Sequence, residues 1–126
     1  MRRLAFTAAL IAALVLPAVA LADGPPPGTY STKITAPAAV KGTWVIKFTK
    51  AGTYTITQSG KVVVHGKFLS INPQIQFYGE TGPRACKSLG FYNWKRSGKV
   101  LKFSSLSDPH CAGRAIVLSH KFTLAG

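Results

Sequence analysis

The sequence predicts an all-β protein, a small antiparallel up-and-down barrel of about eight strands. After residue 28 we find no long run of residues with helical spacing of apolar side chains. Gly, Pro and Asn recur about every five to ten residues instead, which is typical of short strands joined by tight turns. An antiparallel meander leaves two bare edges unless it closes on itself, and this favours a barrel. A β-sandwich is the alternative, but it usually needs longer crossover connections than this chain offers.

The clearest predicted strand is TWVIKFT, 43–49, in which Trp44, Ile46 and Phe48 alternate with more polar residues. A turn at 50–52 leads to TYTITQ, 53–58, so these two segments form a hairpin. The other predicted strands are STKIT (31–35), KVVVH (61–65), KFLSI (67–71), QIQFY (74–78), GFYNWK (90–95), KVLKF (99–103) and RAIVLSHKFTL (114–124).

Two segments need separate comment. Gly66 is expected to mark a bulge or kink between 61–65 and 67–71, where the pattern does not separate inward from outward faces. Residues 79–89 read as a loop. The apolar faces of the remaining strands predict an inward set of Trp44, Ile46, Phe48, Tyr54, Ile56, Ile75, Phe77, Tyr92, Trp94, Leu101 and Phe103.

The chain opens with the pattern of a secretory signal peptide over residues 1–22. Arg2 and Arg3 precede an apolar run that is too short to span a membrane, and small residues follow it. Cleavage near Ala22 predicts a protein that is secreted or held in the cell envelope. Residues 23–28, DGPPPG, then form an extended N-terminal arm, and residues 29–126 form one barrel domain.

The expected mature chain is strongly basic. Removing Arg2 and Arg3 leaves 14 of the 16 Lys and Arg residues against three acidic ones, a net charge of +11. Such a domain favours polyanionic surfaces as partners, or it uses its lysines only for solubility, and both interpretations stay open. The lysines are spread along the chain, which favours the solubility interpretation.

The segment SDPHCAGRAIVL, 107–118, brings Asp108, His110, Cys111 and Arg114 close together, and this raises the question of a cysteine nucleophile. Export to an oxidising compartment makes a disulfide between Cys111 and the one other cysteine, Cys86, the expected state. A disulfide-bonded cysteine is no nucleophile. Asp108, which precedes a proline, is expected to cap a turn through its side chain, and His110 has no predicted role.

The order of several motifs resembles the secreted bacterial lipocalin-like, or calycin-type, barrels. The first strand of those barrels carries a Gly-x-Trp motif, and a basic residue near the barrel's end lies across that indole. The matching motifs here are Gly42-Thr43-Trp44, the hairpin residues Gly52 and Tyr54, the loop residues Gly82, Pro83 and Cys86, the pair Tyr92 and Trp94, and the segment from Asp108 to Arg114.

The resemblance implies a structural clasp in which Arg114 stacks on Trp44, an interaction worth roughly 0.5 to 2 kcal/mol. It also implies a small hydrophobic ligand in the barrel. An eight-stranded barrel either holds such a ligand or is filled by its own side chains. The expected ligand-binding residues of the interior are Trp44, Phe48, Tyr54, Phe77, Tyr92, Trp94 and Phe103.

Two functional hypotheses follow. In the first, the protein carries or sequesters a small hydrophobic ligand; in the alternative, it is a basic envelope or interaction protein with a filled barrel that contacts anionic polymers. No catalytic motif occurs, so we expect no enzyme activity, no cofactor, no metal site and no specific nucleic-acid partner. A barrel enzyme of the isomerase or cyclase kind has only the fold as support.

Overall fold

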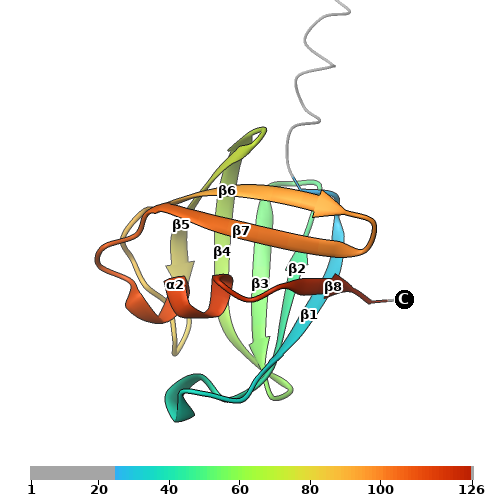
Figure 1. Cartoon of the computed structure of the whole chain (residues 1–126). Helices are drawn as coiled ribbons and strands as arrows, with labels where there is room; N and C mark the ends of the chain where they lie inside the picture. The colour runs from blue at the N-terminus through green and yellow to red at the C-terminus, as the bar shows by residue number, and fades with distance from the viewer. Residues whose placement is uncertain (1–24, 126) are drawn as a thin grey trace, which may run out of the picture.

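The computed structural model describes residues 25–125, which form a closed antiparallel barrel of eight strands (Figure 1). Each strand pairs with its neighbours in the chain, and β8 closes the sheet onto β1. The predicted fold class, an up-and-down barrel of lipocalin-like topology, is confirmed. The strands are β1 (Gly28–Ile34), β2 (Gly42–Phe48), β3 (Thr53–Gln58), β4 (Lys61–Ile71), β5 (Gln74–Thr81), β6 (Gly90–Ser97), β7 (Val100–Ser107) and β8 (Phe122–Leu124).

Because successive strands are antiparallel, their connections alternate between two ends of the barrel. The helix end carries the β1–β2, β3–β4 and β5–β6 connections, together with the 3-10 helix η3 (Ala38–Val40) and the helix α2 (Ala112–Leu118). The hairpin end carries the β2–β3, β4–β5 and β6–β7 turns. The predicted signal peptide, 1–22, lies outside the described residues.

Strand β4 runs through both segments that the sequence separates at Gly66. The pairing of β3 with β4 sets Tyr54 opposite Gly66, and the register of β4 on β5 shifts between His65 and Lys67. A Cβ atom at Gly66 would lie 2.4 Å from the Tyr54 ring, so only glycine lets the ring lie across the bend. The predicted bulge is confirmed.

Aromatic side chains fill the interior. Eight rings form one continuous cluster, with neighbouring centroids 5.2 to 6.4 Å apart and most pairs in edge-to-face geometry. Such pairs add about 0.5 to 1.5 kcal/mol each beyond their buried area. The cluster consists of Tyr30, Phe48, Tyr54, Phe68, Phe77, Tyr92, Phe103 and Phe122. All of the predicted inward residues are buried except Trp94, which packs partly buried against the core.

The prediction of one strand over 114–124 is wrong. The first part of that segment is the helix α2, and only Phe122–Leu124 forms a strand. Residues 115–118 form an unbroken apolar run, and such a run does not distinguish a buried strand from a helix. Helical spacing places Val117 and Leu118 in the core and leaves Ile116 exposed. Within residues 25–125, no helix has the length and apolar character needed to cross a membrane.

Candidate functional site at the helix end of the barrel

Arg114, on α2, joins two buried carboxylates that come from different parts of the barrel. Its Nη1 lies 3.1 Å from Glu80 of β5, while its Nε and Nη2 each lie 2.8 Å from an oxygen of Asp108, which follows β7. The side chains of Arg114, Glu80 and Asp108 are only 5%, 2% and 1% exposed. The contact with Asp108 is bidentate, the geometry in which a guanidinium binds a carboxylate most specifically.

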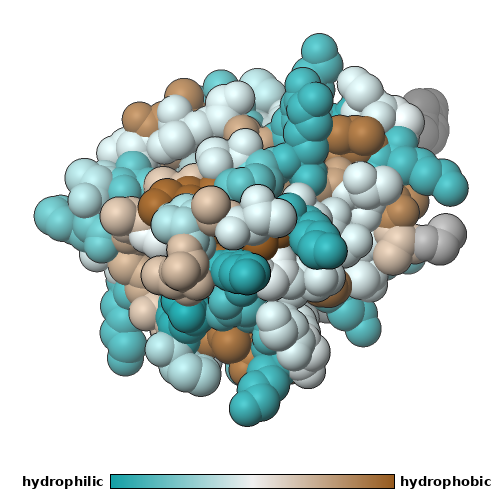
Figure 2. Space-filling model, turned by 60° about the horizontal axis from the view of Figure 1, so that its bottom comes forward, coloured by the Kyte–Doolittle hydropathy of each residue, from teal (hydrophilic) through white to brown (hydrophobic). Residues whose placement is uncertain are grey.

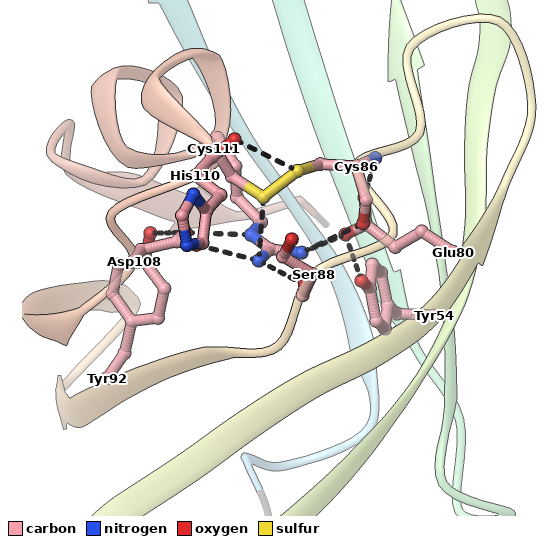
Figure 3. A network of polar contacts seen from close by, with 9 residues as sticks. Tyr54, Glu80, Cys86, Ser88, Tyr92, Asp108, His110 and Cys111 are labelled. Atoms are coloured by element: carbon pink, nitrogen blue, oxygen red, sulfur yellow. Dashed lines mark hydrogen bonds and ion pairs between the residues drawn. A yellow bond between two sulfur atoms is a disulfide. The ribbon is translucent and has the colours of Figure 1, made fainter.

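Two tyrosines of the interior extend this network (Figure 3). The Tyr54 hydroxyl donates to Glu80 and the Tyr92 hydroxyl donates to Asp108. Burial, reinforced by the neighbouring carboxylates, raises the pKa of both tyrosines above its ordinary value near 10. Burial alone would lower the pKa of Arg114, but its bond to Asp108 and the negative charges of both carboxylates raise it. The arginine is therefore permanently charged.

The roles predicted for the two carboxylates change accordingly. Asp108 was expected to cap a turn with its side chain, but both of its oxygens bind Arg114, and only its backbone carbonyl accepts the Cys111 N–H, at 3.4 Å. Glu80 was expected in a loop, but it lies in β5 and is buried. Its second oxygen accepts the backbone N–H of Cys86 at 2.8 Å. A buried carboxylate needs these donors because water does not reach it.

The predicted disulfide between Cys86 and Cys111 is confirmed, with the two Cα atoms 5.9 Å apart. It ties the β5–β6 loop to the start of α2 (Figure 3). Arg114 binds the same two segments: its Nη2 donates to the Ser88 carbonyl at 2.8 Å and lies 3.2 Å from the Cys111 sulfur. The disulfide and the contacts of Arg114 therefore both tie the β5–β6 loop to the start of α2, and we call this place the junction.

Gly90 lets this junction close. A Cβ atom there would lie 2.6 Å from Nη2 of Arg114 and 3.0 Å from Cγ of Asp108. We expect Gly90→Ala to push the ion pair apart and to lower the free energy of unfolding by about 1 to 3 kcal/mol, the usual cost of overpacking. Gly113→Ala is the matched control, because a Cβ there meets no atom within 4 Å in a helix that alanine favours. Equal urea midpoints for both variants would contradict the prediction.

The raised tyrosine pKa values predict a loss of stability in alkali. The folded protein keeps Tyr54 and Tyr92 protonated where the unfolded chain ionises them, so their contribution is complete below about pH 10 and is lost as the pH rises further. Absorbance at 295 nm checks this. Tyr54→Phe and Tyr92→Phe are expected to leave the folded-state titration between pH 9 and 11 unchanged, whereas each removes one ionising group from the urea-unfolded chain. A folded-state loss near pH 10 in either variant would refute it.

The structure places a different arginine over Trp44 from the one predicted for the clasp, Arg114. The guanidinium over the Trp44 ring is that of Arg84, 6.0 Å from the ring centroid, while Arg114 directs its donors to the carboxylates. The Trp44 N–H donates to the Val40 carbonyl at 2.7 Å. The sequence signal for the contact with Trp44 was Arg84, a basic residue in the loop before Cys86, whereas the resemblance to lipocalin-like barrels implied Arg114.

A pocket of about 260 Å³ opens at the helix end, between Trp44 and α2. Apolar side chains form most of its lining, and Glu80, Arg84 and Arg114 add charged atoms. His110, which had no predicted role, is exposed at this pocket. The apolar lining consists of Val40, Trp44, Ile56, Val64, Val117 and Leu118.

The seven residues predicted to bind a ligand inside the barrel do not form one site. Trp44 lines the pocket at the helix end, and Trp94 lies toward the hairpin end, where its N–H donates to Ser70 Oγ at 3.2 Å. The other five belong to the aromatic cluster and contact one another: Phe48, Tyr54, Phe77, Tyr92 and Phe103.

Among residues 25–125, no three His, Cys, Asp or Glu side chains come together in a way that could hold a metal ion. The charged and hydrogen-bonding groups at the helix end bind mainly one another, because both carboxylates form ion pairs with Arg114 and accept hydrogen bonds from the tyrosine hydroxyls.

No protein-family model matches the chain, and no curated protein or solved structure is significantly similar to it. The class defined by fold and site is therefore a disulfide-bonded, eight-stranded antiparallel barrel.

Proposed function

We propose that this is a secreted, lipocalin-like interaction protein whose barrel is a solid scaffold and whose basic exterior binds anionic polymers. In this proposal the protein binds its partner and catalyses no reaction. The ring-filled interior supports it, because side chains that contact one another leave little room for cargo. The disulfide supports an oxidising compartment outside the cytoplasm.

The observation that carries the proposal is the placement of the acidic residues. Between residues 25 and 125 the chain has two, Glu80 and Asp108, and both are buried against Arg114. The outside of the described barrel therefore carries lysines and arginines with no carboxylate side chain among them. Hydrophilic residues are spread over the face drawn in Figure 2, with apolar residues between them. Such a surface attracts polyanions from all sides.

The test is chromatography of the mature protein on a heparin resin. We expect retention at low salt that is lost between low and moderate salt, because exposed charges are screened over about 8 to 10 Å at physiological ionic strength. Protein acetylated on its lysines is the control and should pass through, since acetylation removes the charge. No retention at low salt, or retention unaffected by salt, would contradict the proposal.

A second candidate function is the binding of a small hydrophobic molecule, which the pocket at the helix end favours. Its apolar lining, with Arg84 beside the Trp44 ring, suits a small ligand that has an apolar body and an anionic group. Its volume of about 260 Å³ limits the ligand to a small one.

Tryptophan fluorescence separates this candidate from the first. The variant Trp94→Phe reports on Trp44 in the pocket, and Trp44→Phe reports on Trp94, which does not line it. A panel of short- and medium-chain fatty acids, chosen for a pocket of about 260 Å³, is expected to quench the first variant and not the second. Native mass spectrometry of protein from its own host would show the bound molecule. Equal or absent quenching in the two variants would exclude this site.

A further inference from the structure

The outer face of the β6–β7 hairpin carries two lysines directly opposite each other. Lys95 of β6 pairs with Lys102 of β7, and both are exposed. Opposed side chains on one face have Cβ atoms about 4.5 to 5.5 Å apart, and like charges at that distance destabilise the sheet. With the described carboxylates buried at the helix end, no acidic side chain relieves this repulsion. Stability does not account for the pair, but an anion bound between the two ammonium groups would.

Two surface hollows meet at this pair. One, of about 690 Å³, lies beside the Asn72–Pro73 turn and includes Asn93 and Ser104, which are paired across the strands next to the lysines. The other, of about 280 Å³, continues toward β8. Lys95 and Lys102 line both. The two hollows therefore adjoin at the lysine pair, and together, here called the groove, they offer lining for an elongated ligand on either side of it.

The groove extends its positive charge toward β8. Lys121, just before β8, lines the smaller hollow together with Lys95 and Lys102. Arg96 follows Lys95 in β6 and directs its guanidinium to the other face of the sheet, where its Nη1 donates to the hydroxyl of the buried Tyr30 at 3.1 Å. A ligand that follows the groove therefore meets the ammonium groups of Lys95, Lys102 and Lys121.

The chemistry of the lining favours an acidic polysaccharide. Amide and hydroxyl groups of Asn72, Asn93 and Ser104 both donate and accept hydrogen bonds, as sugar hydroxyls require. Lysine ammonium groups are compact charges that suit carboxylate or sulfate groups. Grooves for single-stranded nucleic acid instead present aromatic rings for stacking. Here Trp94 packs against the core and its N–H is bonded to Ser70.

We propose that the groove centred on Lys95 and Lys102 is the specific site for an acidic polysaccharide, whose anionic groups lie between the paired ammonium groups. This inference rests on the proposed polyanion-binding function and narrows it to one site and one partner class.

The test compares two double variants of equal net charge. Lys95→Gln/Lys102→Gln removes the pair, while Lys33→Gln/Lys61→Gln removes two exposed strand lysines that face the neutral residues Thr43 and Gln58. Binding of a sulfated heparin oligosaccharide and of polygalacturonate is measured over a range of salt concentrations. We expect the first variant to bind at least tenfold more weakly, with a shallower salt dependence, and the control less than threefold more weakly. The first variant should also melt at a higher temperature than wild type.

The other outcomes are decisive. Equal weakening in both double variants would overturn the site while leaving a diffuse polyanion-binding surface. Failure of the wild-type protein to bind either polysaccharide at low salt would overturn the proposed function itself. Tighter, Lys95- and Lys102-dependent binding to an oligothymidine strand than to either polysaccharide would overturn the partner class.

Discussion

Replacing Arg114 by methionine is expected to lower the free energy of unfolding by about 3 to 5 kcal/mol. Methionine keeps an apolar stem but leaves Glu80 and Asp108 buried without a positive partner. Two carboxylates at the same end of a barrel then face the cost of desolvation and their mutual repulsion. Urea unfolding followed by tryptophan fluorescence measures the loss.

Arg84→Met is the matched control. Arg84 is exposed, and its contacts are the Trp44 ring and the Ala39 carbonyl, so its loss should cost no more than about 1 kcal/mol. Adding Glu80→Gln and Asp108→Asn to Arg114→Met should restore part of the stability, because no buried charge then remains. If Arg114→Met costs as little as Arg84→Met, the buried network does not hold the helix end together.

Removal of the disulfide has the second large expected effect. Cys86→Ala/Cys111→Ala should lower the free energy of unfolding by about 3.5 kcal/mol, because the bridge spans 25 residues and restricts the unfolded chain. Thermal melting with and without dithiothreitol measures this. The reductant should lower the melting temperature of the wild type and leave that of the double variant unchanged.

A thiol assay supplies the control. Both cysteines are in the disulfide, so oxidised protein should react with no thiol reagent even when unfolded. Two reactive thiols in protein purified from its own host would contradict the pairing and would return Cys111 to consideration as a nucleophile beside Asp108 and His110.

The alternation of residues such as Trp44, Ile46 and Phe48 determined a great deal about this protein. Period-two spacing assigned the inward faces of most strands, and the short turns required consecutive strands to pair, which leaves closure as the way to remove the edges. The disulfide also followed from sequence, because the chain is expected to be exported and its two cysteines have one partner each. These features depend on the local spacing of apolar residues and turns and on the number of cysteines.

The tertiary structure decided which groups meet at the helix end and what the interior contains. Glu80 lies far from Asp108 and Arg114 in the sequence, and only the packing of β5 and α2 places the one cation between the two carboxylates. The helix over residues 112–118 likewise depends on the barrel, because its continuous apolar run has no period of its own and the contacts of Val117 and Leu118 with the core select the helix. Long-range burial and charge pairing are properties of the folded chain, and local sequence spacing does not contain them.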